Sequence, residues 1–182
     1  MFEVEQKFPV ECLDEMCERL IALGGKLDDP LEQVDAYYRH PSRDFAQTDE
    51  ALRIRRIGQR NLVTYKGPKI DSTTKTRREI ELPLPPGNAG AAQFAELLTA
   101  LGFTLVAEVH KVRRAVHLIW QARAVEAALD DVAGVGEFVE LETSADEAEL
   151  ADAKACLASL AKELELTTTE RRSYLEMLLG VG

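Results

Sequence analysis

Charged residues occupy alternate positions in the first strand-like segment of the chain. In FEVEQKF, Glu3, Glu5 and Lys7 occur at every second position, with Val, Gln and Phe among them. Strand side chains point alternately to opposite faces, so these charges share one face at intervals of roughly 6.5–7 Å. A solvent-facing edge strand explains such a pattern when it occurs alone. Its meaning therefore depends on the other strands.

Hydrophobic spacing predicts many strands and a few helices. We expect strands over residues 1–9, 31–38, 51–57, 62–66, 76–84, 103–119, 122–132 and 137–143. Apolar residues at helical spacing predict helices over 12–23, over 91–101 and through most of the tail from about 146. Residues 39–50 are predicted to form a polar loop. The order indicates one α+β domain of 182 residues, with antiparallel strands dominant and helices grouped around them.

The alternation of charged and apolar positions recurs in five later segments. The residues that share a face are Arg53 with Arg55, Thr64 with Lys66, Arg77 with Glu79 and Glu81, Lys111 with Arg113, and Glu140 with Glu142. Two interpretations are open. Each strand points its charges to solvent, or the sheet is closed with the charges inside and helices packed on its outer apolar face.

The residue types of these charged faces suggest a chemistry. Carboxylates recur as E-x-E pairs, which can hold a hard divalent cation such as Mg²⁺ or Mn²⁺ through oxygen. Arginines also recur in pairs, and guanidinium groups match phosphate oxygens in a forked geometry. A site with both would suit a metal-bound polyanion, above all a polyphosphate. Spacing alone does not separate this site from a solvated face.

Composition and charge exclude several classes of protein. The net charge of −10 argues against general nucleic-acid binding, which depends on neutralising phosphates. No apolar run is long enough to span a membrane, and no signal peptide is visible. The three cysteines, Cys12, Cys17 and Cys156, fit neither a disulfide framework nor a zinc site. We therefore expect a cytoplasmic protein with no nucleic-acid or membrane partner.

An ordered series of motifs resembles one known family. The series EVEQK, TDEALRIRR, TYKGPK, TRREIEL, HKVRR and LDDVAGVGEFVELE is similar to the CYTH superfamily, also called triphosphate tunnel metalloenzymes. The resemblance runs from residue 1 to about 142, and ERRSYLEMLL resembles the family's C-terminal helix. It implies an eight-stranded antiparallel closed β-barrel, a tunnel with charges inside and helices packed outside.

The resemblance also implies roles for the inward charges. The acids that resemble metal ligands are Glu3, Glu5, Glu79, Glu81, Asp130, Glu140 and Glu142. The bases that resemble the triphosphate-binding set are Lys7, Arg53, Arg55, Lys66, Arg77, Lys111 and Arg113. Neighbouring Asp131 leaves the position of the aspartate open by one residue. Lys7 and Arg55 are the catalytic candidates, and Lys7 could act as a general base only after losing its proton.

Superfamily members include inorganic and thiamine triphosphatases and class IV adenylyl cyclases. We expect a triphosphatase that uses Mg²⁺ or Mn²⁺ and acts on tripolyphosphate, ATP or thiamine triphosphate. The alternative is a class IV adenylyl cyclase, because DAYYRHPSRDFAQTDEALRIRR resembles that branch. Authentic cyclases tend to carry a His-Phe pair before the first strand, whereas this chain begins with Met1-Phe2. A non-catalytic polyphosphate sensor is the third reading, and a homodimer is expected only by analogy.

Other polar residues are less informative. His40, His110 and His117 are scattered and lack clustered ligands, so we expect surface or core histidines. Gly134 and Gly136 lack the Lys-Ser/Thr ending of a phosphate loop and predict a tight turn before a strand.

Overall fold

A computed structural model describes residues 2–68 and 76–180. Its strands are β1 (Phe2–Pro9), β2 (Lys26–Leu27), β3 (Leu31–Arg39), β4 (Ala51–Ile57), β5 (Arg60–Lys66), β6 (Glu79–Leu84), β7 (Thr104–Trp120), β8 (Arg123–Val132) and β9 (Gly136–Ala145). Its helices are α1 (Leu13–Ala22), α2 (Phe45–Thr48), α3 (Gly87–Ala100), the 3-10 turn η1 (Glu147–Glu149), α4 (Leu150–Glu163) and α5 (Tyr174–Leu178). None of these described helices is long and apolar enough to cross a membrane.

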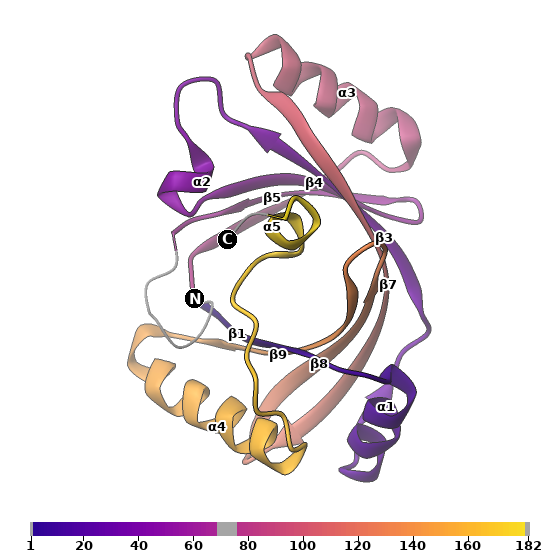
Figure 1. Ribbon diagram of the computed structural model, residues 1–182. Helices are drawn as coiled ribbons and strands as arrows, with labels where there is room; N and C mark the ends of the chain where they lie inside the picture. The colour runs from indigo at the N-terminus through magenta and orange to yellow at the C-terminus, as the bar shows by residue number, and fades with distance from the viewer. Residues whose placement is uncertain (1, 69–75, 181–182) are drawn as a thin grey trace.

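Eight strands form one curled antiparallel sheet in the order β1-β9-β8-β7-β3-β4-β5-β6, and β2 pairs with β7 beside it. Figure 1 looks into the space that the sheet surrounds. The two ends of the sheet meet where Glu3 forms a single bridge to Arg77. The predicted α+β architecture is confirmed. Closure between β1 and β6 is less complete than predicted, because one bridge joins their described residues in place of a full ladder.

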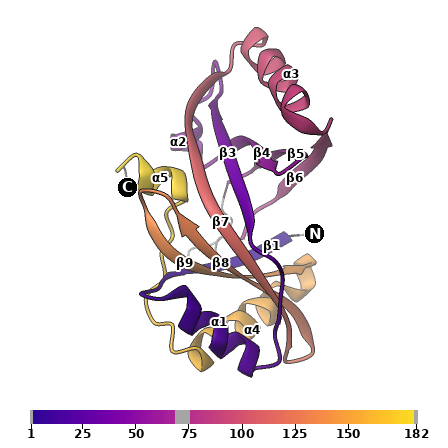
Figure 2. The ribbon, with the colours of Figure 1, turned by 90° about the vertical axis from the view of Figure 1, so that its right-hand side faces the viewer.

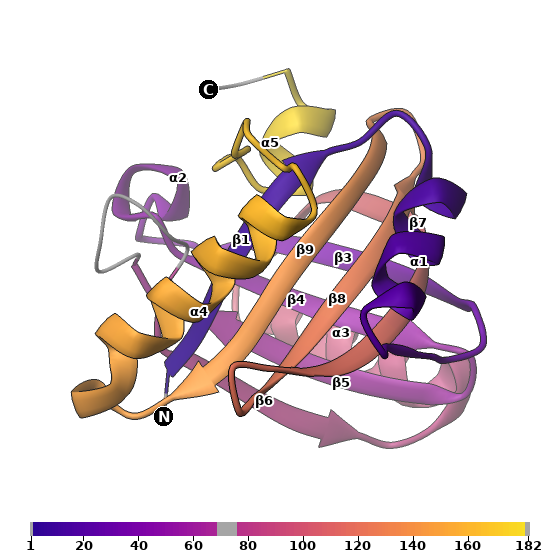
Figure 3. The same ribbon diagram turned by 90° about the horizontal axis from the view of Figure 1, so that it is seen from below.

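The outer face of the sheet carries the main hydrophobic core. Apolar residues of β1, β8 and β9, such as Val4 and Leu141, pack against α1 and α4. In α1, Leu13, Met16 and Leu20 recur at helical spacing, so one stripe of the helix is buried on the sheet. Figure 3 shows α4 in front of β1 and β9, and α1 on the side of β7 and β8. Because the apolar face points outward to these helices, the charged face must point inward.

A second, smaller core covers the other half of the barrel. Helix α3 packs Ala91 and Leu98 against Ala36 on β3 and Ile54 on β4. Figure 2 shows α3 on the opposite side of the barrel from α1 and α4. Helices therefore cover the sheet from two sides and fix its curl around the central space.

Most predicted elements are present, with differences at their ends. The predicted polar loop 39–50 contains the short helix α2, whose first turn is capped by Asp44 accepting from the Ala46 amide at 3.1 Å. The predicted helix 91–101 begins four residues earlier, at Gly87. Up to residue 180, where the described chain ends, the tail is helical only in η1, α4 and α5, and an irregular segment separates α4 from α5. Gly134, between β8 and β9, and Gly136, the first residue of β9, both have positive φ, as the predicted tight turn requires.

Candidate active site

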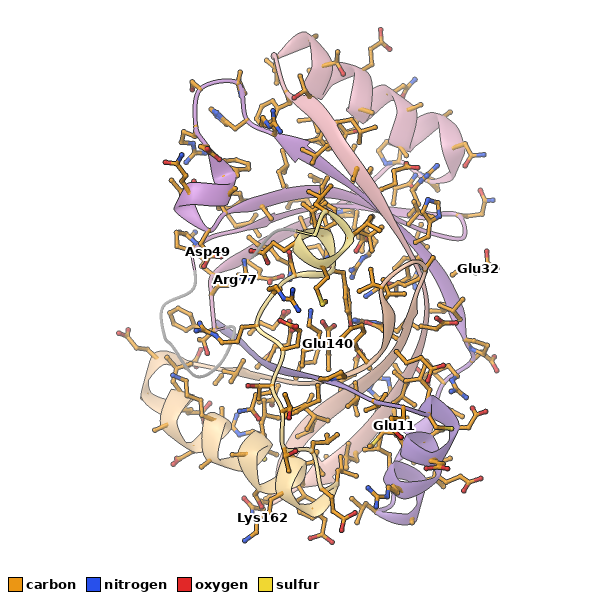
Figure 4. All side chains as sticks on the ribbon, viewed as in Figure 1. Glu11, Glu32, Asp49, Arg77, Glu140 and Lys162 are labelled. Atoms are coloured by element: carbon orange, nitrogen blue, oxygen red, sulfur yellow. The ribbon has the colours of Figure 1, made fainter. Side chains whose placement is uncertain are left out.

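The inward faces of the strands surround a cavity of about 1050 Å³. The predicted site residues that line it are Glu3, Glu5, Lys7, Arg53, Arg55, Lys66, Arg77, Glu79, Glu81, Lys111, Arg113, Glu140 and Glu142. Figure 4 shows Glu140 and Arg77 beside the central space, whereas Glu11, Glu32 and Lys162 lie outside the barrel. The charges therefore face inward, and the interpretation of a solvated charged face is wrong.

Asp35 organises the two arginines of β4. Its carboxylate accepts from Arg55 Nε and a terminal nitrogen, both at 2.7 Å, and from Arg53 at 3.2 Å. Burial acts to raise the pKa of Asp35, but Arg53 and Arg55 outweigh it and hold that pKa below its usual range. Arg53 Nε is buried and has no acceptor among the described residues. A polyanion in the cavity would supply one.

Asp130 organises the two bases of β7. It accepts from Lys111 at 3.0 Å, from Arg113 at 2.7 and 2.6 Å and from the Tyr174 hydroxyl at 2.9 Å. Asp130 is fully buried behind the cavity wall, whereas Asp131 is exposed, so the inward aspartate is Asp130. Burial and the neighbouring Arg113 lower the pKa of Lys111 to about 8. In this conformation Asp130 orients bases, and its predicted role as a metal ligand stays a prediction.

A row of acids crosses β1, β9 and β8, the three strands that follow β7 in the sheet. Glu5 on β1 lies opposite Glu142 on β9, and Glu142 lies opposite Glu126 on β8. Burial and nearby Glu3 raise the pKa of Glu142 to about 8, and Glu126 and Glu5 add to this effect. Glu126 was not predicted. Mutual repulsion in the row makes it favourable to place a cation there.

Glu140, on β9, accepts a hydrogen bond from Arg113 at 2.5 Å. The predicted acids Glu3, Glu79 and Glu81 lie near the seam of the barrel. Lys66 forms a hydrogen bond with Glu79 and lies 3.7 Å from Glu3. Glu81 accepts from the Thr64 hydroxyl at 3.0 Å. These contacts place a third group of charges next to the acid row, across the single bridge that closes the sheet.

The C-terminal segment crosses in front of the space that the sheet surrounds (Figure 1), and its residues Tyr174 and Glu176 line the cavity. Lys7 Nζ donates to the Arg172 carbonyl at 2.5 Å and lies 4.0 Å from the centre of the Tyr174 ring. The Glu170 amide donates back to the Lys7 carbonyl at 2.7 Å. Ser173 and Glu176 form a capping box that begins α5. The segment therefore fixes the Lys7 ammonium as a hydrogen-bond donor.

Comparison with known proteins identifies the family. The CYTH domain model matches residues 1–174. The chain belongs to the CYTH family. It is 37% identical to the Methanocaldococcus jannaschii protein MJ0240, which is provisionally named an adenylate cyclase, over 97% of this chain and 98% of that protein.

Solved structures show the same CYTH fold. The Pyrococcus horikoshii protein PH1819 is 39% identical, with a TM-score of 0.86 and 98% of each chain covered. The Hippeastrum protein HpAC1 bears an adenylyl cyclase name and is described as having a dominant triphosphatase activity. It is 16% identical, with a TM-score of 0.69 over 98% of this chain and 95% of that chain, and so shows the shared fold alone.

The acid row suits the divalent cation on which CYTH enzymes depend. Its donors are all carboxylate oxygens, the ligands that Mg²⁺ and Mn²⁺ prefer. No three acids, histidines or cysteines of the described residues converge into a preformed metal cluster. Mg²⁺ is commonly held by one or two carboxylates together with substrate phosphates and waters, so a protein-only cage is not required. The residues present fit the cation.

The histidines follow the expectation in part. His40 packs on Phe45 and Phe103, and His110 is exposed on the outer face. His40 and His117 both border the cavity, and His117 lies 3.0 Å from Asp28 and 3.6 Å from Glu126. No sequence motif marked this position, because its acidic neighbours come from a distant loop and from β8.

Four polar residues of the site were missed by sequence reasoning: Gln33, Asp35, Glu126 and Tyr174. The signal for the first two was present, since Gln33 and Asp35 alternate with apolar residues in LEQVDAYY. Arg114 was correctly left out, because it points to the outer face and pairs with Asp14 at 2.8 Å.

Proposed function

We propose that this CYTH protein is a divalent-metal-dependent phosphohydrolase that acts on a triphosphate-containing substrate. The observation that carries the proposal is the division of one cavity between two opposite chemistries. The bases of β4 and β7 line one wall, held in place by Asp35 and Asp130. The acid row lines the neighbouring strands β8, β9 and β1. A metal-bound triphosphate presents the complementary charge to both.

The basic side chains are already oriented to bind phosphate. Arg55 and Arg113 are each held by two hydrogen bonds to one aspartate, which fixes the plane of the guanidinium. Such preorganised donors stabilise charge that develops on phosphoryl oxygens without reorganising during the reaction. We assign Arg53, Arg55, Lys66, Arg77, Lys111 and Arg113 to triphosphate binding. Arg55 is the candidate for stabilising the transition state.

We assign Glu3, Glu5 and Glu142 as the residues that hold the cation, with Glu79, Glu81, Asp130 and Glu140 as further candidate ligands. When bound, Mg²⁺ or Mn²⁺ supplies charge neutralisation and Lewis-acid polarisation of phosphate oxygens. Lys7 Nζ lies over the Tyr174 ring, and its hydrogen bond to the Arg172 carbonyl favours a charged donor over a general base. Water then attacks the terminal phosphorus, and a diphosphate product leaves.

A class IV adenylyl cyclase is the alternative. The name of the M. jannaschii relative supports it, as does the similarity of residues 35–56 to the cyclase branch. In that reaction the ribose 3′-hydroxyl of ATP attacks the α-phosphorus and pyrophosphate leaves. The described activity of HpAC1 favours the hydrolase, although the likeness to HpAC1 is one of fold only.

Product analysis separates these functions. The protein is incubated with Mg²⁺ or Mn²⁺ and, in separate reactions, with tripolyphosphate, ATP or thiamine triphosphate. Orthophosphate release that stops on addition of EDTA supports the hydrolase. Cyclic AMP with pyrophosphate establishes the cyclase instead. Tight binding without any turnover would overturn both the hydrolase and the cyclase and would indicate a non-catalytic polyphosphate sensor.

A further inference from the structure

Gln33 is a buried amide in the cavity wall that takes part in none of the ion pairs. It lies on the inward face of β3, two residues before Asp35, and only 5% of its surface is exposed. Its Oε1 atom accepts no hydrogen bond from any described residue. An unpaired buried amide oxygen is costly, so it points to a donor that something bound in the cavity supplies.

The groups around Gln33 do not supply that donor. In the strand register, Gln33 lies between Lys111 on β7 and Ile57 on β4. Lys111 donates to Asp130 at 3.0 Å, and Ile57 has no polar side chain. Asp35 is itself an acceptor and is occupied by two arginines. Gln33 is therefore a neutral acceptor set among groups that bind anions.

An ionised triphosphate cannot satisfy Gln33 Oε1, because phosphate oxygens are acceptors too. A water molecule can, because it donates through O–H while keeping a lone pair for another partner. We propose that Gln33 holds the water that attacks the terminal phosphorus, an inference that rests on the proposed hydrolase function. The last torsion of a glutamine is soft, so the amide can turn its oxygen toward such a water. Its amide nitrogen can then donate to a phosphate oxygen.

The step is balanced without a further reactant. The water oxygen forms a bond to the terminal phosphorus, and the bond from that phosphorus to the bridging oxygen breaks. The bridging oxygen leaves with the electron pair as part of the diphosphate product. One proton of the water remains on the orthophosphate, and the other passes to a phosphate oxygen or to solvent. Gln33 accepts a hydrogen bond and is not protonated, which matches the role of amides that orient attacking water in other phosphoryl-transfer enzymes.

The chain offers a matched control in Gln6. Its Oε1 is likewise buried without a partner among the described residues, but Gln6 is absent from the cavity wall and alternates with the inward residues of β1. Gln6→Leu therefore makes the same chemical change outside the site. The experiment measures kcat and KM for orthophosphate release from tripolyphosphate with Mg²⁺, for wild type, Gln6→Leu, Gln33→Leu and Gln33→Glu.

We expect Gln33→Leu to lower kcat by about 100-fold while KM changes by less than about threefold, because misplacing the nucleophile affects the transition state more than binding. Gln33→Glu keeps an acceptor and should recover kcat about tenfold over Gln33→Leu, with a higher KM from its added charge. Gln6→Leu should resemble wild type. A Gln33→Leu kcat equal to that of Gln6→Leu would overturn the role of Gln33 alone. Absence of orthophosphate release from wild type would overturn the hydrolase itself.

Discussion

Asp35 holds two arginines in the orientation that a phosphate would require. We expect Asp35→Asn to lower the free energy of unfolding at pH 7 by about 3–5 kcal/mol, because it removes one partner of a buried ion pair. The folded-state pKa of Asp35 is depressed, so its stabilising effect is present above the unfolded pKa of about 3.9. That effect is lost as pH falls through the folded pKa.

Urea unfolding of wild type and Asp35→Asn at several pH values tests this. The difference in unfolding free energy should be constant above about pH 5 and should shrink as the solution is made more acidic. Asp131→Asn serves as the control, because Asp131 is exposed and its substitution should change stability by less than about 0.5 kcal/mol. A difference that grows in acid would show that the folded-state pKa of Asp35 is raised and not depressed.

Glu142 is the centre of the acid row, so its substitution tests the metal assignment. We expect Glu142→Gln to lower turnover at limiting Mg²⁺ by about 100-fold and to leave the fold intact, because Gln keeps the shape and removes the charge. Added Mg²⁺ should restore part of the activity. Measuring activity over a range of Mg²⁺ concentrations gives both the loss of turnover at limiting metal and its recovery at high metal. Glu32→Gln, on the outer face, is the control, and equal metal requirements in the two variants would remove Glu142 from the site.

At the scale of single residues, the sequence predicted which side chains face the cavity better than it predicted which of them form ion pairs with one another. Alternation along each strand fixes the direction of a side chain, which is why the predicted bases and acids line one space. Pairing depends on the register between strands. Asp35 meets Arg55 only because β3 and β4 align these two residues, and no pattern within either strand carries that information.

At the scale of elements, the β7–β8 hairpin contains an uncommon turn. Strand pairing ends at Trp120 and Arg123, so the loop has only two residues, Gln121 and Ala122. Both have positive φ, 47° and 63°, as in a type I′ turn, although neither is glycine or asparagine. The sequence therefore predicted a break between strands here without any turn signal to define it. The register of the long strands imposes the turn.

This turn gives a prediction that is independent of function. Ala122→Gly should raise the free energy of unfolding by about 1 kcal/mol, because a left-handed backbone penalises alanine and not glycine. Ala124→Gly, two residues later within β8, is the control and should lower stability, because glycine weakens a strand. Thermal or urea unfolding measures the stability of both variants. A loss of stability in Ala122→Gly as large as that in Ala124→Gly would mean that this turn is not strained.

At the scale of the whole molecule, the ordered series of motifs predicted the barrel, and hydrophobic spacing predicted the helices that cover it. The C-terminal segment was the least predictable part. Its path over the cavity depends on contacts that join residues far apart in the sequence, such as Glu170 with Lys7 and Tyr174 with Asp130. Local periodicity cannot report such contacts, and only the helix at its end carried a recognisable capping pattern.

The division of charge across the cavity predicts that metal and triphosphate bind cooperatively. Without ligands, Asp35 and Asp130 already neutralise part of the positive charge of the bases, so tripolyphosphate alone gains little binding free energy from them. It is also repelled by the acid row. Mg²⁺ alone relieves that repulsion. We expect Mg²⁺ to tighten tripolyphosphate binding by about 10- to 100-fold, and tripolyphosphate to tighten Mg²⁺ binding by the same factor, because the coupling is reciprocal.

Calorimetry on wild type in the presence of a non-hydrolysable triphosphate analogue measures this coupling in both directions. The melting temperature should rise more with both ligands together than the sum of the separate rises. In Glu142→Gln the coupling should shrink, because the row loses the group whose raised pKa keeps it largely protonated without metal and whose carboxylate the cation would stabilise. Glu32→Gln should retain the full coupling. Independent binding of the two ligands to wild type would mean that the acids and the bases of the cavity serve separate sites, and the shared triphosphate–metal site would then be abandoned.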